Sequence, residues 1–409
     1  MAADPASRPI LTKEKALTSS VTPHVKSQES WRDERDLLNR SRFELTRRAV
    51  AGVPDALRVA GTPLLAQPGW IPTTPVPLDA VRLEWAGTAA PAPITGREAS
   101  LQGSLPLADD GAPFGRYAEA VEALARPRLF ENRQCYRLLD VDELPGGGPR
   151  LRFGRGSYFD VIDICEAAAH EFASGAAAVG PDGAVPAERT PFRAEIGDPT
   201  DLARRPVMAA ISTLTIRHDT AAGTASFVLH WRDPEKVATG GGLYQVMPVG
   251  MFQPSADAPH NEANDFDLWR STARELSEEL LGSTENYGSE ASPIDYEGWP
   301  FFAALEDARH AGTARVFWLG LGVDALTFVC DMLTVVVFEA ATFDELFPKM
   351  ASTNDEGHRV VDAEDATGRS VGIPFRGDHV ERLTEREHMQ PAGAALLRLA
   401  WQHRDTLLP

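Results

Sequence analysis

Apolar runs of strand length, separated by turn residues, fill the second half of the chain and restrict its fold more than any other feature. The strand-like runs are 207–219, 224–233, 242–255 and two within 315–346. A charged stretch with helical spacing, 264–282, lies between them, and an amphipathic stretch, 391–405, follows them. Strands, one helix, more strands and a final helix predict an α+β fold in which helices cover a sheet.

The first half of the chain has a different pattern of polar and apolar residues. Residues 1–28 are polar and lack a period, which predicts a flexible tail. Helices are predicted at 30–50, 114–127 and 158–177, and a pair of strands at 135–154. We therefore expect an N-terminal α+β domain of unassigned role over 29–190, a link at 180–191, and a second domain over 205–409.

Charge and cysteine usage exclude several classes of protein. The formal net charge of −19 argues against a partner that is a nucleic-acid polymer, because phosphate backbones select basic surfaces. Cys135, Cys165 and Cys330 are far apart and form neither a disulfide framework nor a zinc motif. No apolar run approaches the length of a membrane span, and the N-terminus lacks a signal-peptide core. We expect a cytoplasmic protein without a membrane partner.

The stretch RELSEELLG at 274–282 carries the clearest chemical signal. Glu275, Glu278 and Glu279 have i, i+3 and i+4 spacing, so a helix places their carboxylates on one face. The apolar positions, which form a separate stripe, are Trp269, Ala273, Leu276 and Leu280. Such a carboxylate face suits a hard divalent cation. It is equally typical of the solvated side of an ordinary helix, and the spacing alone leaves both interpretations open.

The same stretch resembles the core of the Nudix box, a glycine loop followed by R-E-U-x-E-E, in which U is aliphatic. Arg274, Glu275, Leu276, Glu278 and Glu279 match that core residue for residue. The resemblance covers about 205–405. Within the family, this region is similar to a branch of large actinobacterial members with an enlarged loop. It implies an α/β/α sandwich for the C-terminal domain, beside a smaller N-terminal α+β domain.

The resemblance also implies an activity. Nudix enzymes hydrolyse a diphosphate linkage by water attack at phosphorus, and Mg²⁺ or Mn²⁺ would be the cofactor. The substrate would be a nucleoside diphosphate derivative or another organic diphosphate. Glu278 and Glu279 would be the main metal ligands, and Glu275 a further ligand or the base that accepts the proton of the water. Arg274 would orient the glutamates.

Two positions depart from the family pattern. The glycine expected fourteen residues before the arginine is His260, and the glutamate expected eight before it is Phe266. The loop 251–267 is enlarged, and Gly282 lies one residue later than the pattern requires. The candidates for the missing carboxylate are Glu262, Asp265 and Asp267. We expect this loop to cover the diphosphate site; the alternative is a solvated insertion without substrate contact.

Substrate-binding residues are less sharply indicated. Gly250 would allow close approach of the substrate, although a turn after Pro248 explains it equally well. Arg232 and Lys236 lie on or beside predicted strands and would bind the diphosphate, with solvated surface as the alternative. A second functional hypothesis is a regulatory, ligand-sensing protein that keeps a Nudix-like fold. The sequence leaves a homodimer open.

Overall fold

The apolar run at 207–219 forms β6 (Val207–Asp219), the central strand of the computed structural model. Four strands pair with β6. The strand β12 (Cys330–Glu339) is parallel to it, whereas β4 (Gln134–Glu143), β7 (Thr224–Phe227) and β10 (Val249–Met251) are antiparallel. The structure describes residues 22–409 except 129, 144–147, 182, 233–241, 284–290, 349, 351–356, 361–362 and 365–369.

The remaining strands extend this sheet on both sides. In chain order they are β1 (Leu64–Leu65), β2 (Val76–Pro77), β3 (Arg82–Trp85), β5 (Pro149–Ser157), β11 (Ala314–Asp324), β14 (Ala363–Glu364) and β15 (Ser370–Pro374). The main path of the sheet runs β1-β11-β12-β6-β4-β5-β3. A second sheet has the order β13-β8-β9, formed by Gly357–Val360, Leu229–Arg232 and Tyr244–Val246.

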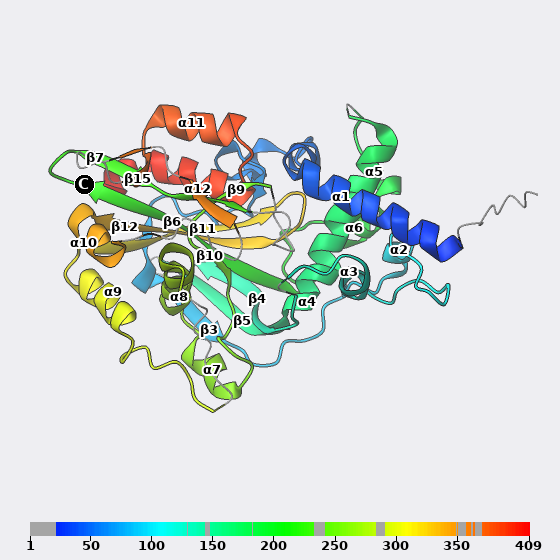
Figure 1. Ribbon diagram of the computed structural model, residues 1–409, viewed down its shortest axis with the longest axis horizontal. Coiled ribbons are helices and arrows are strands. Elements are labelled where there is room, and N and C mark those ends of the chain that lie inside the picture. Colours follow the sequence, from blue (N-terminus) through cyan, green and yellow to red (C-terminus); the bar gives the residue numbers. More distant parts are fainter. Residues whose placement is uncertain are drawn as a thin grey trace, which may run out of the picture.

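Helices and short helical turns surround the strands (Figure 1). The helices of the first half are α1 (Pro23–Ala49), α2 (Ala99–Gln102), α3 (Tyr117–Leu124), α4 (Tyr158–Val161), α5 (Ala167–Val179) and α6 (Pro191–Ile196). Those of the second half are α7 (Pro259–Asn264), α8 (Leu268–Leu281), α9 (Pro300–His310), α10 (Ala340–Leu346), α11 (Gly377–Arg386), α12 (Pro391–Gln402) and α13 (Arg404–Leu407). Single 3-10 turns are η1 (Asp55–Leu57), η2 (Val59–Gly61), η3 (Leu78–Ala80) and η5 (Ala187–Arg189), and η4 (Ile162–Glu166) is π-helical.

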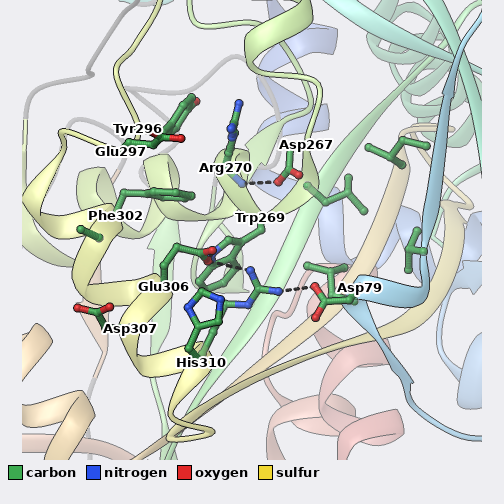
Figure 2. Close-up of a pocket in the computed structure, with 16 residues that line it drawn as sticks. Asp79, Asp267, Trp269, Arg270, Tyr296, Glu297, Phe302, Glu306, Asp307 and His310 are labelled. Atoms are coloured by element: carbon green, nitrogen blue, oxygen red, sulfur yellow. Dashed lines mark hydrogen bonds and ion pairs between the residues drawn. The ribbon is translucent and has the colours of Figure 1, made fainter.

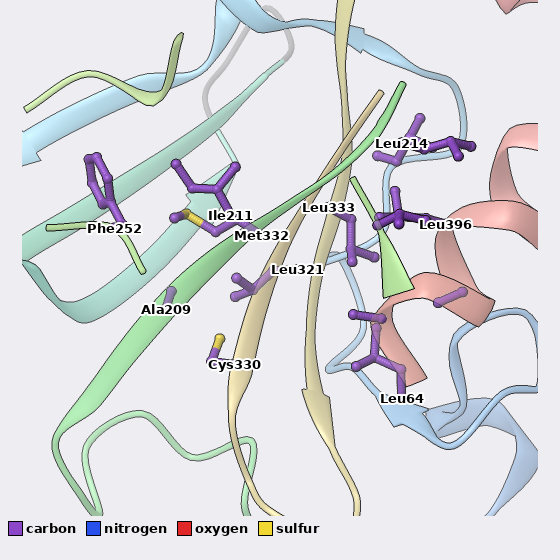
Figure 3. Packing of buried hydrophobic residues seen from close by; sticks show 14 of the residues in the cluster. Leu64, Ala209, Ile211, Leu214, Phe252, Leu321, Cys330, Met332, Leu333 and Leu396 are labelled. Carbon is purple, nitrogen blue, oxygen red and sulfur yellow. The ribbon is translucent and has the colours of Figure 1, made fainter. Parts of the chain in front are cut away.

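Helices cover both faces of the central strands. Arg217 on β6 pairs with Asp344 of α10. Leu214, three residues earlier and therefore on the opposite face, lies toward Leu396 of α12 (Figure 3). The two faces belong to one buried apolar core, which also contains Ile211. The α+β class predicted from the alternation of strand and helix patterns is confirmed.

The sheet crosses the boundary predicted at 190–205. Strand β4 pairs with β6 through Arg137 opposite Met208, and β1 pairs with β11 through Leu64 opposite Asp324. The regions 29–190 and 205–409 thus contribute strands to the same sheet. Helix α1 begins at Pro23, so residues 23–28 are helical and not part of a tail, while 1–21 lie outside the described residues.

Candidate functional site

Helix α8 carries the RELSEE stretch, and both of its ends are fixed by local chemistry. The Asp267 side chain caps the first turn by accepting a hydrogen bond from the backbone N–H of Arg270 at 2.8 Å. Gly282 ends the helix in a left-handed conformation, with φ of 68°. The helix begins at Leu268, four residues after the start of the stretch 264–282 that the sequence predicts to be helical. Leu276 and Leu280 are fully buried, as the apolar stripe predicts.

Glu275 lies directly against the backbone of Gly250 in β10. A methyl group built on Gly250 would be 1.8 Å from Glu275 Oε1, far inside the contact distance of two atoms. A side chain at position 250 would displace this carboxylate. The glycine therefore makes room for the Glu275 carboxylate within a strand, and a turn is not the reason for it.

Glu279 reaches the neighbouring residue of the same strand. Its Oε1 accepts a hydrogen bond of 3.0 Å from the backbone N–H of Val249, and its side chain is buried. Glu278 is half-buried. Two of the three predicted carboxylates thus converge on Val249 and Gly250, and the solvated-face interpretation does not describe Glu279.

Arg274 is buried beside these glutamates, but its hydrogen bonds go elsewhere. Its Nη2 donates to the carbonyl of Gln253 at 2.8 Å and to Ser271 Oγ at 3.2 Å. Within the part of the chain that the structure describes, no ion pair joins Arg274 to the glutamates that it was expected to orient. Arg274 instead fastens α8 to the segment that follows β10, so it holds helix and strand together.

A metal site in a protein needs several ligand side chains close together. Among the described residues, no group of three or more histidine, cysteine, aspartate or glutamate side chains is placed to hold one. Mg²⁺ usually keeps several waters and binds through one or two carboxylates and the phosphates of a substrate. The pair Glu275 and Glu279 fits that lower requirement, with the substrate completing the set of oxygen ligands.

The predicted substrate residues Gly250 and Arg232 line one cavity of about 160 Å³, which we call the α1–β10 cavity. Val249 and Met251 lie opposite Ser212 and Ala210 on β6, so their side chains project on the Ala210 face. The cavity is on this face, whereas Glu275 approaches from the other. The structure therefore brings Gly250 and Arg232 together, and it separates Arg232 from the carboxylates by the thickness of β10.

Lys236, the third predicted substrate residue, lies outside the described residues. The opposite wall of the α1–β10 cavity comes from the N-terminal region, through Arg42 and Thr46 of α1 and Tyr158 and Val161 of α4. Residues from both predicted domains thus form a single cavity.

Asp331 of β12 is a buried acid in this cavity. Its Oδ1 accepts a hydrogen bond of 2.8 Å from Ser212 Oγ. Burial raises the pKa of the Asp331 carboxyl to about 7, because a charged carboxylate is poorly stabilised away from water. Near neutral pH both the protonated and the ionised forms of this group are therefore populated.

A larger groove of about 640 Å³ lies at the start of α8, between α9 and the segment 78–83 (Figure 2). Trp269 Nε1 donates to Glu306 at 2.7 Å, and the Arg309 guanidinium lies 5.1 Å from the Trp269 ring and pairs with Asp79. Arg270 lies 4.7 Å from the Tyr296 ring. The rings and cations of the groove are thus engaged with neighbouring side chains. Trp269 is a core residue and not a free stacking platform.

The enlarged loop 251–267 is built into the N-terminal strands. Glu262 pairs with Arg155 of β5 and accepts a hydrogen bond of 2.7 Å from Gln134 of β4. Asp265 is buried and accepts hydrogen bonds from Ser255 N–H at 2.7 Å and Tyr296 O–H at 2.9 Å.

All three candidates for the missing glutamate therefore have structural partners. Glu262 fastens the loop to β4 and β5, Asp265 holds the loop itself, and Asp267 caps α8. None of them takes the place that the sequence analysis suggested. Its described acidic residues pack the loop against neighbouring elements, so it is not a solvated insertion.

Comparison with known proteins adds no assignment. No family model matches this chain, and no curated protein sequence matches it. The Nudix resemblance consequently rests on the residues of α8 and the strand before it. None of the described helices is both long and apolar enough to cross a membrane.

Arg42 and Asp331 were not among the residues predicted from the sequence. A signal for Arg42 was present, because Trp31, Leu38 and Leu45 recur at heptad-like spacing and Arg35 and Arg42 occupy the same stripe. Arginines in an otherwise apolar stripe must find buried partners. Asp331 interrupts an apolar strand, which is a similar but weaker signal.

Proposed function

We propose that the protein is a metal-dependent hydrolase that cleaves the diphosphate linkage of a nucleoside diphosphate derivative or another organic diphosphate. The observation that carries the proposal is the convergence of Glu275 and Glu279 on the backbone of β10 at Gly250 and Val249. Two carboxylates at i, i+4 spacing repel each other, and a bound cation would offset that repulsion.

The roles of the side chains follow from their places. Glu275 and Glu279, together with the half-buried Glu278, would hold Mg²⁺ or Mn²⁺, and Glu275 could also accept a proton from the attacking water. When bound, the cation would offset the charge of the diphosphate and activate the water. Arg274 keeps α8 in place by its bond to the Gln253 carbonyl.

Gly250 is the predicted substrate residue that borders the carboxylates. Arg232 lines the α1–β10 cavity on the other face of β10, so it is given no role in the proposed hydrolysis. The acidic balance of the chain favours a small ligand over a nucleic-acid chain. A membrane partner is not part of the proposal, and a homodimer remains an expectation from the sequence.

The alternative is a regulatory protein that binds a diphosphate without cleaving it. One observation favours it: no described group of three acidic, histidine or cysteine side chains is placed for a metal. The two functions differ in product formation, since only the hydrolase releases a phosphorylated product from the diphosphate.

The test is a product-release screen of the purified protein against a panel of organic diphosphates with Mg²⁺, with Mn²⁺ and with a chelator. The hydrolase predicts turnover that requires the cation and falls by about 10²-fold or more in Glu275→Gln and Glu279→Gln. Glu297→Gln, a change at an exposed glutamate, is the matched control. Saturable substrate binding without product would favour the regulatory alternative.

A further inference from the structure

The α1–β10 cavity contains buried charge that the proposed hydrolysis does not use. Arg42 of α1 lines it and is only 2% exposed. Its two terminal nitrogens bind both carboxylate oxygens of Glu166, at 3.1 Å and 2.8 Å, and Nη2 also donates to Asn39 Oδ1 at 3.0 Å. The Nε–H donor is buried and has no hydrogen-bond partner among the described residues. A buried donor normally has an acceptor, so this one indicates a missing partner.

The charges around Glu166 leave a positive excess. Arg35 also pairs with Glu166, with its Nη1 3.5 Å from Oε2, so two guanidinium groups share a single carboxylate. Glu166 ends the π-helical turn η4, and such turns are frequent at functional sites. Arg232 is buried and lines the sheet side of the cavity.

The acids of the cavity do not cancel this excess. Asp324 accepts hydrogen bonds from the backbone N–H groups of Leu326 and Thr327, and Asp331 accepts one from Ser212. Burial raises the pKa of both carboxyls, so each favours its neutral form more than an exposed aspartate does. A protonated Asp331 would donate a hydrogen bond to an anion.

Size restricts the ligand. An apolar cavity of about 150 Å³ is large enough to hold benzene, and such a cavity contains no water. The α1–β10 cavity is similar in volume at about 160 Å³ but is lined by buried arginine, aspartate and glutamine side chains. It therefore has room for a polar group of a few non-hydrogen atoms and the donors that such a group requires.

We propose that the α1–β10 cavity binds a small oxyanion of the phosphate class, and that Arg42 is its main cationic contact. The N-terminal region then has a function, because α1 and α4 close the anion site against β10 and β12. The inference does not rest on hydrolysis: the site would bind inorganic phosphate in the absence of any cation cofactor.

The experiment is calorimetric titration of the full chain with inorganic phosphate in the presence of a chelator, at constant ionic strength. We expect saturable binding of one phosphate, with a Kd of about 1 mM or lower. Arg42→Lys should weaken binding by about tenfold or more, because lysine keeps the charge but loses the planar donor set. Arg35→Lys is the matched control, because Arg35 is also buried and pairs with Glu166 but does not line the cavity.

A second variant separates loss of phosphate binding from loss of folding caused by a change at the Arg42–Glu166 pair. Thr46 is buried and lines the cavity, so Thr46→Leu fills part of the space and leaves both ion pairs with Glu166 intact. It should weaken phosphate binding while the circular dichroism spectrum stays unchanged. Absence of phosphate binding in the wild type would overturn the proposal, as would equal binding by wild type, Arg42→Lys and Thr46→Leu. Hydrolysis could fail with phosphate binding intact, so the two proposals fail separately.

Discussion

At the scale of single residues, the absence of a side chain at Gly250 has a specific consequence. The carboxylate of Glu275 occupies the space that a Cβ would fill, with only 1.8 Å between the two positions. The backbone φ of Gly250 is not in the left-handed region, so the requirement is one of space and not of conformation. The position of the Glu275 carboxylate therefore depends on this residue.

We predict that Gly250→Ala displaces the Glu275 carboxylate from its place against β10. Overpacking of this kind costs about 1–3 kcal/mol of unfolding free energy, and the proposed activity should fall with it. Urea denaturation measures the first effect and the product-release assay the second. Gly103→Ala is the control, since a methyl group there meets nothing within 4 Å and the backbone is right-handed. Equal stability and equal activity of Gly250→Ala and wild type would show that neither depends on the space that Glu275 occupies beside Gly250.

Asp331 leads to a prediction about pH. Because burial raises the pKa of its carboxyl from 3.8 to about 7, the folded state favours the protonated form. Below about pH 4 Asp331 is protonated in both the folded and the unfolded state, and the unfolding free energy is not reduced. As the pH rises from about 4 to about 7, the unfolding free energy decreases. The rise in pKa corresponds to a loss of at most about 4 kcal/mol of unfolding free energy, at 1.36 kcal/mol for each pKa unit.

Asp331→Asn removes this titration and keeps an oxygen that can accept the Ser212 hydrogen bond. We predict that the difference in unfolding free energy, variant minus wild type, increases between pH 4 and pH 7 and stays level above pH 8. Urea titrations of both proteins at several pH values measure it. A difference that does not change with pH would place the carboxyl in a more polar environment than the structure gives it.

At the scale of elements, helix α8 combines a buried apolar stripe with the carboxylate face. Leu280 is fully buried and belongs to the main core. Leu280→Ala should lower the unfolding free energy by about 2–5 kcal/mol, because it removes apolar contacts and leaves a cavity. Thermal or urea unfolding tests this, with Leu57→Ala, a change at an exposed leucine, as the control. An effect as small as that of the control would mean that the faces of α8 are assigned wrongly.

The strands and α8 could be predicted because their signals are local and periodic. The run at 207–219, the strand pair at 135–154 and the stripe through Leu276 and Leu280 all appear as expected. The partners of the enlarged loop could not be predicted. Glu262 meets Arg155, 107 residues away in the chain, and no local pattern encodes that contact.

The α1–β10 cavity was invisible in the sequence for the same reason. Arg42 and Gly250 belong to two regions that the sequence predicts to be separate domains, because the pattern of apolar and polar residues changes near residue 200. Turn-rich composition at 180–191 suggested a link there. Whether two regions share a sheet depends on pairing between distant strands, such as Leu138 opposite Val207, and single-sequence patterns do not report it.

At the scale of the whole molecule, the shared sheet predicts that the two regions do not fold apart. A chain limited to 205–409 would lose the pairing of β6 with β4 and of β11 with β1 and β2. It would also expose part of one continuous apolar core. We predict that this fragment aggregates or lacks cooperative unfolding, as judged by size-exclusion chromatography and circular dichroism. A monomeric fragment with a sharp transition would instead support two independent domains.

Strand β10 is three residues long and stands between the carboxylates of α8 and the α1–β10 cavity. Anything that moves this strand from one side alters the shape presented on the other. Binding of Mn²⁺ at Glu275 and Glu279 and binding of phosphate near Arg42 would then be thermodynamically coupled. Linkage requires the coupling to be reciprocal: the factor by which the cation changes the phosphate affinity equals the factor by which phosphate changes the cation affinity.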